Sequence, residues 1–157
     1  KEAFYDCASC YLRPEVARAL TLANDWFCEK GYKILLYDCY RPVSAQKKMW
    51  KAFPNPQYMA NPYTSGSVHN RGAAVDISLV KLDGTPVDMG TDHDFFGKEA
   101  HIDYTGLPEE VSQNRKLLQE GMTFYGFETI RTEWWHFNFK KNYSFSIIDF
   151  DFPCKTE

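Results

Sequence analysis

The sequence has 157 residues, a length that suits one domain built on one hydrophobic core. Hydrophobic residues make up 44% of it, aromatic residues 17% and charged residues 25%, which is typical of a globular chain and excludes a disordered one. The net charge is −3 without a long basic run, so we expect no nucleic-acid partner. No apolar stretch approaches the roughly 18–20 residues that a membrane span needs. We therefore expect a soluble protein in which residues 1–157 form a single domain.

The chain begins KEAFYDCASC, without an initiator methionine and without the apolar segment of a signal peptide. This start fits either a trimmed chain or removal of a signal peptide, so both a periplasmic and a cytoplasmic location agree with the sequence. The number of cysteines, five, is odd, and complete pairing within the chain is impossible. We expect free thiols or one disulfide between the chain ends, with Cys154 bonded to Cys7 or Cys10. No second cysteine pair accompanies Cys7 and Cys10, so a structural zinc site is not expected there.

The first half of the chain predicts two helices on either side of a strand. A helix is predicted over residues 14–30, where apolar residues recur at helical spacing. The segment YKILLYDCY, residues 32–40, is short and rich in β-forming residues, which predicts a mostly buried strand. Ser44 is expected to cap a second helix that ends near residue 53. A loop with three prolines then leads to His69.

The next segments predict a strand, a hairpin and a third helix. Residues 73–82 alternate as a strand does, and Asp76 points away from the bulkier apolar face. A turn follows, and a short strand over residues 86–89 is expected to complete a hairpin. The third helix is predicted over residues 108–120, with acidic residues in its first turn and Gly121 at its end.

The C-terminal part predicts two strands, over residues 124–130 and 134–139, and a tail that forms either an edge strand or a surface wrap. Residues three apart face opposite sides of a regular strand. Glu133 and His136 can therefore reach one site only if Glu133 lies in an irregular start of the second strand or beside a bulge. We predict the irregular start.

Together these elements predict an α+β fold. We expect a central, mainly antiparallel sheet that carries a zinc site on one face, with the three helices, 14–30, 44–53 and 108–120, packed around it. Trp134 and Trp135 are expected in the core and the pocket wall.

Three residues far apart in the sequence form a ligand set for a metal ion. His69, Asp76 and His136 offer two imidazoles and one carboxylate, which is the ligand set of a catalytic zinc ion that keeps its fourth position for water. Glu133, three residues before the last ligand, is a candidate general base. Amide hydrolysis also needs a fixed positive group where negative charge develops, and Arg41 at a predicted strand end is the best candidate.

The residues resemble a known family, the VanX-type D-alanyl-D-alanine dipeptidases, which are zinc metallopeptidases related to D-Ala-D-Ala carboxypeptidases and to the hedgehog domain. The resemblance covers nearly the whole chain and rests on LYDCYRPVSAQ, SVHNRGAAVDISL, VDMGTDHDF and EWWHF. The second and fourth segments are shared with the carboxypeptidases, whereas the first and third are typical of the dipeptidases.

The resemblance implies a role for each of these residues. One zinc ion per chain would be bound by the two histidines and Asp76, with Glu133 as catalytic base and Arg41 stabilising the tetrahedral intermediate. Asp94 would hold the free ammonium of the substrate, and Ser67 would lie near its carboxylate. The chain departs from the family at His93, where a phenylalanine is usual, and at the N-terminus, where the family has a longer lead-in.

The implied activity is hydrolysis of the small dipeptide D-alanyl-D-alanine in peptidoglycan precursor or fragment metabolism. A pocket that pairs both charged ends of a dipeptide leaves one partner unpaired when a longer peptide binds, which favours strict length selection. Two alternatives stay open at this point. The first is a D,D- or L,D-carboxypeptidase on longer muropeptides, favoured if the short N-terminus leaves the pocket open. The second is a non-catalytic zinc-binding module, against which Glu133 and Arg41 argue.

Overall fold

The computed structural model describes residues 9–151 and has at its centre a four-stranded antiparallel sheet in the order β1-β2-β4-β3. Its strands are β1 (Tyr32–Asp38), β2 (Ala74–Lys81), β3 (Phe127–Ile130) and β4 (Glu133–Phe139). The helices are α1 (Pro14–Glu29), α2 (Val43–Ala52) and α3 (Glu109–Phe124), with short 3-10 turns η1 (Val68–Arg71), η2 (Lys98–Ala100) and η3 (Asn142–Ser144). The α+β class, the antiparallel sheet and the three helices are as predicted.

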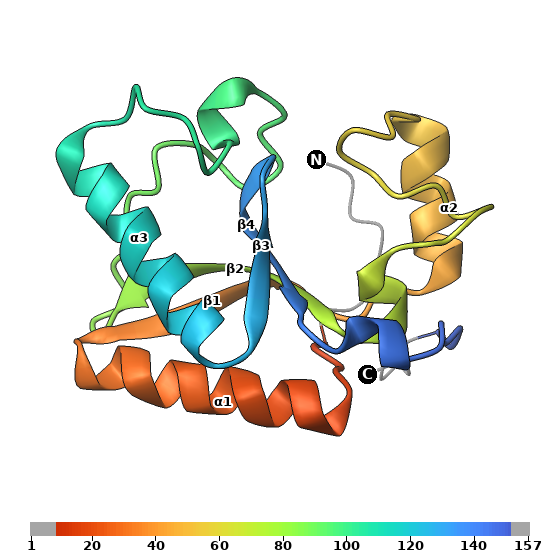
Figure 1. The fold of residues 1–157 in the computed structure, drawn as a ribbon, viewed down its shortest axis with the longest axis horizontal. Coiled ribbons are helices and arrows are strands. Elements are labelled where there is room, and N and C mark those ends of the chain that lie inside the picture. Colours follow the sequence, from red (N-terminus) through yellow and green to blue (C-terminus); the bar gives the residue numbers. More distant parts are fainter. Residues whose placement is uncertain (1–8, 152–157) are drawn as a thin grey trace, which may run out of the picture.

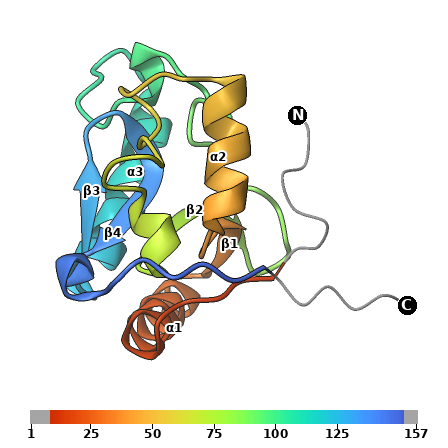
Figure 2. The same cartoon turned by 90° about the vertical axis from the view of Figure 1, so that its right-hand side faces the viewer.

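The helices divide between two sides of the sheet. Helices α1 and α3 contact one another, α1 also contacts β1, and α3 contacts β3. Helix α2 stands on the far side of β3 and β4 from α3 (Figure 1), and the turned view shows it well separated from α1 (Figure 2). The face of the sheet toward α2 is thus the one that can carry a site.

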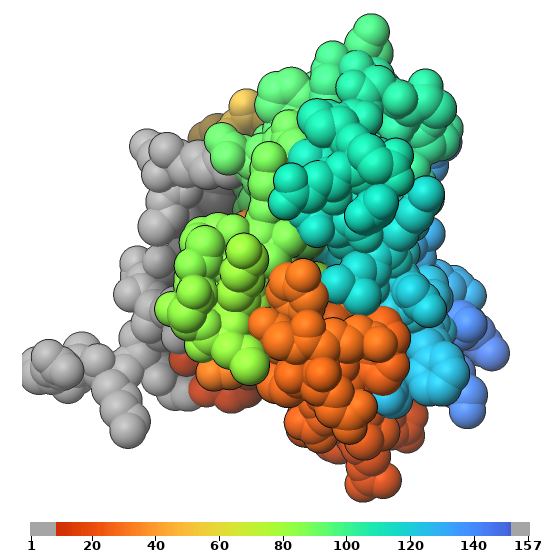
Figure 3. Space-filling model, turned by 90° about the vertical axis from the view of Figure 1, so that its left-hand side faces the viewer, coloured from red at the N-terminus to blue at the C-terminus, as the bar shows by residue number. Residues whose placement is uncertain are grey.

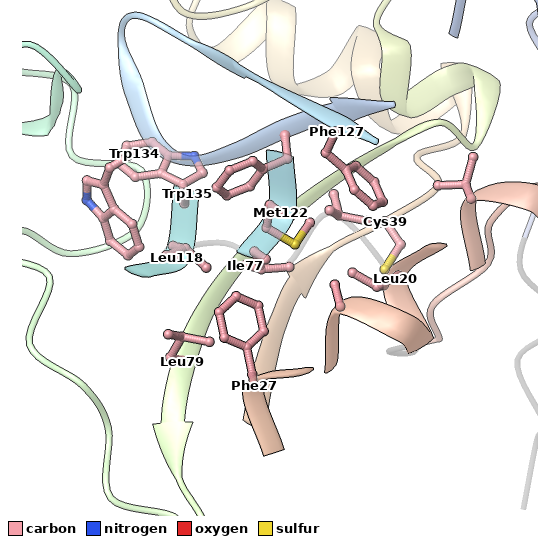
Figure 4. Packing of buried hydrophobic residues seen from close by; sticks show 14 of the residues in the cluster. Leu20, Phe27, Cys39, Ile77, Leu79, Leu118, Met122, Phe127, Trp134 and Trp135 are labelled. Atoms are coloured by element: carbon pink, nitrogen blue, oxygen red, sulfur yellow. The ribbon is translucent and has the colours of Figure 1, made fainter. Parts of the chain in front are cut away.

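The core fills the space between the sheet and the pair α1 and α3. Figure 4 shows side chains from both helices meeting those of β2, β3 and β4. Every second residue of β2 from Val75 to Leu79 is fully buried, because alternate residues of a strand face the same side. Trp134 and Trp135 are 2% and 1% exposed, which confirms their predicted place in the core. Each large apolar side chain buried in this way contributes about 1.5–3 kcal/mol to stability.

Helix α3 was predicted to end at Gly121. In the structure it continues to Phe124. Gly121 lies inside the helix where α3 approaches α1. A methyl group at this position would come within 2.8 Å of the Phe27 ring and of the Trp26 ring, which is closer than atoms can pack. The glycine is therefore required by the approach of two helices and not by a helix end. In Figure 3, α3 and the C-terminal end of α1 lie side by side with the turn that follows β2.

Two predicted details of the strands are wrong. Strand β1 is half exposed and not mostly buried, because it forms one edge of the sheet. The expected second strand of a hairpin over residues 86–89 is reduced to one bridge between Val80 and Pro86, although the turn before it is present. The chain then leaves the sheet toward α3.

Ser44 does not cap α2. Pro42 occupies the N-cap position, and no side chain there accepts a hydrogen bond from the helix. The Ser44 hydroxyl lies in the first turn and donates instead to Oδ1 of Asp151 at 3.2 Å. The proline already has the extended backbone conformation that precedes a helix.

The C-terminal tail is a surface wrap within the described residues and pairs with no strand there. The Ile148 amide donates to the Asn70 carbonyl at 3.0 Å, and Nη1 of Arg71 donates to the Phe145 carbonyl at 2.6 Å. The Phe150 ring stacks on Tyr40 with centroids 4.5 Å apart. The tail thus covers η1 from outside (Figure 2).

The described cysteines pair in a way that differs from the expectation. Cys10 forms a disulfide with Cys39, just after β1, so it is not bonded to Cys154. Cys28 is a free thiol. Cys7 and Cys154 lie outside the described residues. The connectivity could not be deduced from spacing, because several pairings of the same cysteines fit one sequence.

Among the described residues, no helix combines the length and the apolar character that crossing a bilayer requires.

Candidate metal centre

The three predicted ligands come together on the face of the sheet toward α2. Asp76 and His136 are direct partners across the antiparallel strands β2 and β4, and His69 arrives from η1. Nδ1 of His136 lies 2.9 Å from Oδ1 of Asp76 and 3.2 Å from Nε2 of His69, and the latter lies 3.4 Å from the same carboxylate oxygen. Three donor atoms thus surround one point.

The donor set fits zinc. A tetrahedral zinc ion with bonds of about 2.0–2.1 Å separates its ligand atoms by about 3.3–3.4 Å. The three edges of this triangle, 2.9, 3.2 and 3.4 Å, approach that geometry. All three side chains are nearly buried. Three protein ligands of this kind are typical of catalytic zinc, in which a further position faces the substrate.

Each imidazole is oriented by a carbonyl oxygen on its other side. Nδ1 of His69 lies 2.6 Å from the Cys39 carbonyl, and Nε2 of His136 lies 2.9 Å from Oδ1 of Asn138. A carbonyl only accepts, so each of these nitrogens must carry the proton. The remaining nitrogen of each ring then presents its lone pair to the metal.

Sequence reasoning missed both of these acceptors. The Cys39 carbonyl belongs to the main chain, and no side-chain pattern could reveal it. Asn138 stands two residues after His136 on the same strand, and residues two apart face the same side. That spacing is the signal that could have identified it.

Asp76 stays ionised although it is buried. Burial by itself would raise the pKa of this carboxyl group. Attraction to His69 and the close polar contacts with His136, His69 and His93 outweigh burial and hold the pKa well below its usual value. Nη2 of Arg41 adds a positive group 3.7 Å from Oδ2. The ligand is therefore ready to bind a cation.

The guanidinium of Arg41 is held rigidly beside the ligands. Nε and Nη2 donate to Oδ2 of Asp38 at 2.9 and 2.6 Å, and Nη1 donates to Oε1 of Gln46 at 2.8 Å. Gln46 is fully buried and donates in turn to the Ala60 carbonyl at 2.8 Å. Arg41 was predicted as the positive group of the site, whereas its partners Asp38 and Gln46 were not predicted. Asp38 stands at the start of the same DCYRP segment, and that position was a signal that could have identified it.

Glu133 is the first residue of β4 and lies beside a break in strand pairing. Thr129 of β3 pairs with Phe137, but its neighbour Ile130 pairs with Glu133, so the register shifts between them. Glu133 is itself paired within β4, so the irregularity is a break in pairing between it and Phe137, which is the bulge alternative and not the predicted irregular start. Glu133 lines the same cavity as His136. Both side chains can therefore reach one site.

The carboxyl group of Glu133 is perturbed in the way a general base requires. Burial raises its pKa to about 7, with His136 and Arg41 opposing the rise and Asp76 adding to it. A pKa near the working pH lets one group both accept and return a proton.

The ligands and Glu133 open into a cavity of about 280 Å³ that Ser67 and Asp94 also line. The Ser67 hydroxyl accepts from the His69 amide at 3.2 Å, while the Ser67 amide donates to Oδ1 of Asn70 at 2.7 Å. Asp94 has φ +60°, in the left-handed region that non-glycine residues rarely adopt. Both predicted substrate residues thus share the cavity with the metal ligands.

His93 lies beside Asp76 and not on the open surface. Its ring stacks on Tyr37 with centroids 4.4 Å apart and meets Trp135 edge-on. Nε2 lies 3.8 Å from Oδ2 of Asp76 and 3.3 Å from Oδ1 of Asp94. The residue that departs from the family pattern therefore touches both a metal ligand and a substrate residue. His101 is buried.

Comparison with known proteins identifies relatives of this chain. A family model, Peptidase M15, described as D-ala-D-ala dipeptidase, matches residues 1–154. The D-alanyl-D-alanine dipeptidase of Escherichia coli (strain K12) is 35% identical over 153 residues, which cover 98% of this chain and 79% of that protein.

Solved structures share the fold. A vancomycin resistance D,D-pentapeptidase VanY from a VanB-type cassette, in complex with Zn(II), matches with a TM-score of 0.52 and 17% identity over 82% of this chain and 72% of its own. VanYB in complex with D-Alanine-D-Alanine matches with a TM-score of 0.52 and 16% identity, over 85% and 74% of the two chains.

Removing the acceptor behind His136 should weaken metal binding. We expect Asn138→Ala to lower zinc affinity about 10–100-fold, because Nε2–H loses the carbonyl that orients the ring. Asn138→Asp keeps an oxygen in that place and should bind zinc nearly as tightly as the wild type. Competition with a chromogenic chelator measures all three affinities. Equal affinities of the alanine variant and the wild type would show that this hydrogen bond does not orient the ligand.

Glu133 should make the metal-free protein less stable as the pH rises. Its folded-state pKa of about 7 lies above the ordinary value of 4.5, so the folded state binds the proton more tightly. The contribution of this group to stability is complete below the ordinary pKa and is lost as the pH rises toward 7. Glutamine cannot ionise, so the advantage of Glu133→Gln over the wild type should grow by about 2–3 kcal/mol between about pH 5 and pH 8.

Urea unfolding of the chelator-treated wild type and variant at the two pH values measures this difference. Glu128→Gln, an exposed glutamate on β3, is the control and should show no such change. If the difference in unfolding free energy between Glu133→Gln and the wild type were the same at both pH values, the raised pKa of Glu133 would be contradicted.

Proposed function

We propose that this chain, which belongs to the Peptidase M15 family of D-alanyl-D-alanine dipeptidases, hydrolyses the dipeptide D-alanyl-D-alanine with one zinc ion. The observation that carries the proposal is the convergence of His69, Asp76 and His136 on one point beside Glu133, in a cavity of about 280 Å³. A relative by fold holds Zn(II), and another holds the same dipeptide. The continuous core among the described residues supports a single zinc peptidase domain.

Zinc bound by His69, Asp76 and His136 would supply a Lewis acid and an acidified water. Glu133 then takes the proton of the attacking water and passes it to the departing amine. Burial raises the pKa of this carboxyl group, which favours the protonated form that must exist between the two transfers.

Arg41 stabilises the negative charge that develops on the carbonyl oxygen. Asp38 and Gln46 fix its guanidinium before the substrate arrives. A donor that is already in place does not have to reorganise when the charge appears, which is why such groups contribute strongly to catalysis. Gln46 and Asp38 are positioning residues in this scheme.

Asp94 and Ser67 bind the two ends of the dipeptide. The Asp94 carboxylate pairs with the free ammonium. The Ser67 oxygen already accepts from the His69 amide, so its hydroxyl hydrogen can be donated to the substrate carboxylate. Since each charged end of the substrate needs a partner inside a small cavity, a blocked amine offers no positive charge to the Asp94 carboxylate and binds less well.

A dipeptidase requires a free amine on its substrate, whereas a carboxypeptidase acts on substrates whose amine is blocked. The two activities can therefore be distinguished by comparing free and N-acetylated substrates. We expect the wild type to hydrolyse D-alanyl-D-alanine and to act poorly on its N-acetylated form. Glu133→Gln should lower kcat at least about 100-fold, because it removes the proton carrier. Zinc content, measured by atomic emission, should be unchanged, and Glu128→Gln should keep full activity.

Two outcomes would overturn these assignments. Activity on the blocked substrate alone would identify a carboxypeptidase. Undiminished hydrolysis by a Glu133→Gln variant that retains zinc would exclude Glu133 as the base.

The disulfide supports a location for the protein. Bonded pairs such as Cys10 and Cys39 persist in oxidising compartments and are rare in the cytoplasm. We therefore propose that the chain works in an extracytoplasmic compartment such as the periplasm, where fragments of the cell wall are released.

Alkylation under non-reducing conditions checks this proposal. In protein isolated from its host, mass spectrometry should find Cys28 alkylated after denaturation, while Cys10 and Cys39 are protected until a reductant is added. Alkylation of all three without a reductant would contradict an oxidising location.

A further inference from the structure

Three aromatic rings from two separate loops meet at the edge of the zinc cavity. Phe53 and Phe96 stack with centroids 5.3 Å apart and an angle of 8° between the rings, and Tyr58 lies 4.9 Å from Phe96. Phe53 and Tyr58 follow α2, whereas Phe96 belongs to the segment between β2 and α3. We call Phe53, Tyr58 and Phe96 the aromatic clasp, because their contacts join two loops that are far apart in the sequence.

Core packing does not account for the aromatic clasp. Phe53 is 39% exposed and Phe96 is 40% exposed, and neither belongs to the hydrophobic core. Tyr58 and Phe96 instead line the cavity that the metal ligands and Glu133 share. Exposed rings stacked over a cavity edge point to a role in access to the cavity.

The clasp lies next to the residue assigned to the substrate amine. Phe96 is two residues beyond Asp94, and both line the cavity. The left-handed backbone of Asp94, at φ +60°, turns the chain sharply just before the ring. Because Asp94, Phe96 and Tyr58 line the same cavity, a group attached to the substrate nitrogen at Asp94 would share that cavity with the two rings.

We propose that the aromatic clasp closes the amine end of the cavity and sets the length of the peptide that the enzyme accepts. This inference rests on the proposed function, since it requires the substrate ammonium at Asp94. Asp94 disfavours a blocked amine because the positive charge that it binds is missing. The aromatic clasp disfavours it because the added group needs space that the rings occupy. Phe96 is the ring that meets the extra group, and Phe53 positions Phe96 by stacking on it.

The test compares kcat/KM for D-alanyl-D-alanine with kcat/KM for its N-acetylated form and for a tripeptide with one more N-terminal residue. Phe96→Ala should lower the ratio of dipeptide to extended-substrate activity at least about tenfold, mainly through a lower KM for the extended substrates. Phe53→Ala should change the ratio in the same direction by a smaller factor, because Phe96 loses its stacking partner.

Phe95→Ala is the matched control. Phe95 is next in sequence, is 43% exposed, and is not among the residues that line the cavity. It should leave the ratio unchanged. Thermal unfolding and zinc content confirm that each variant is folded, and Phe96→Leu, which keeps an apolar side chain, should restore part of the selectivity.

The outcomes distinguish this inference from the proposed function. If the wild type cleaves the dipeptide and a folded Phe96→Ala variant has the same ratio of dipeptide to extended-substrate activity, only the proposed role of the aromatic clasp is refuted. A wild type that does not cleave the dipeptide would refute the proposed function, and the role of the clasp with it.

Discussion

The direct pairing of Asp76 and His136 across β2 and β4 is the constraint on which the site depends. Side chains that face each other on neighbouring antiparallel strands start about 4.5–5.5 Å apart at Cβ. Two ligands are therefore held at a nearly constant separation by the sheet itself, and only His69 has to be delivered by a turn. The other residues follow from that pair, because Arg41, His93 and Glu133 all surround the buried carboxylate and its partner.

The candidate metal ligands could be identified from the sequence because their chemistry is visible in residue type. A carboxylate inside a buried strand is costly unless a strong partner compensates its charge, and a metal ion shared with two histidines is such a partner. Strand periodicity even required an irregularity in the pairing beside Glu133. Gln46 could not be recognised in the same way, because a glutamine is common on any surface and this one acquires its role only when the fold brings it against Arg41. The residue type of Asn138 was equally uninformative, and only its place two residues after His136 offered a signal.

The parts of the fold that were predicted wrongly depend on contacts between elements. Local pattern identified β1 as a strand, but its half-exposed state follows from the strand order, which places it at an edge. Gly121 resembled a helix end because glycine often stands there. Its actual reason is the ring of Phe27 on another helix, and nothing near Gly121 in the sequence encodes that contact.

Cys39 joins two functions that can vary independently. Its carbonyl orients His69, while its side chain is cross-linked to Cys10. Any amino acid at this position supplies the same carbonyl, so evolution can add or remove the cross-link without altering the ligand set. Homologous enzymes that work in a reducing compartment could replace both cysteines and keep the same chemistry. A protein engineer could likewise replace both cysteines by small apolar residues, because the Cys39 side chain is buried in the core and its carbonyl would still orient His69.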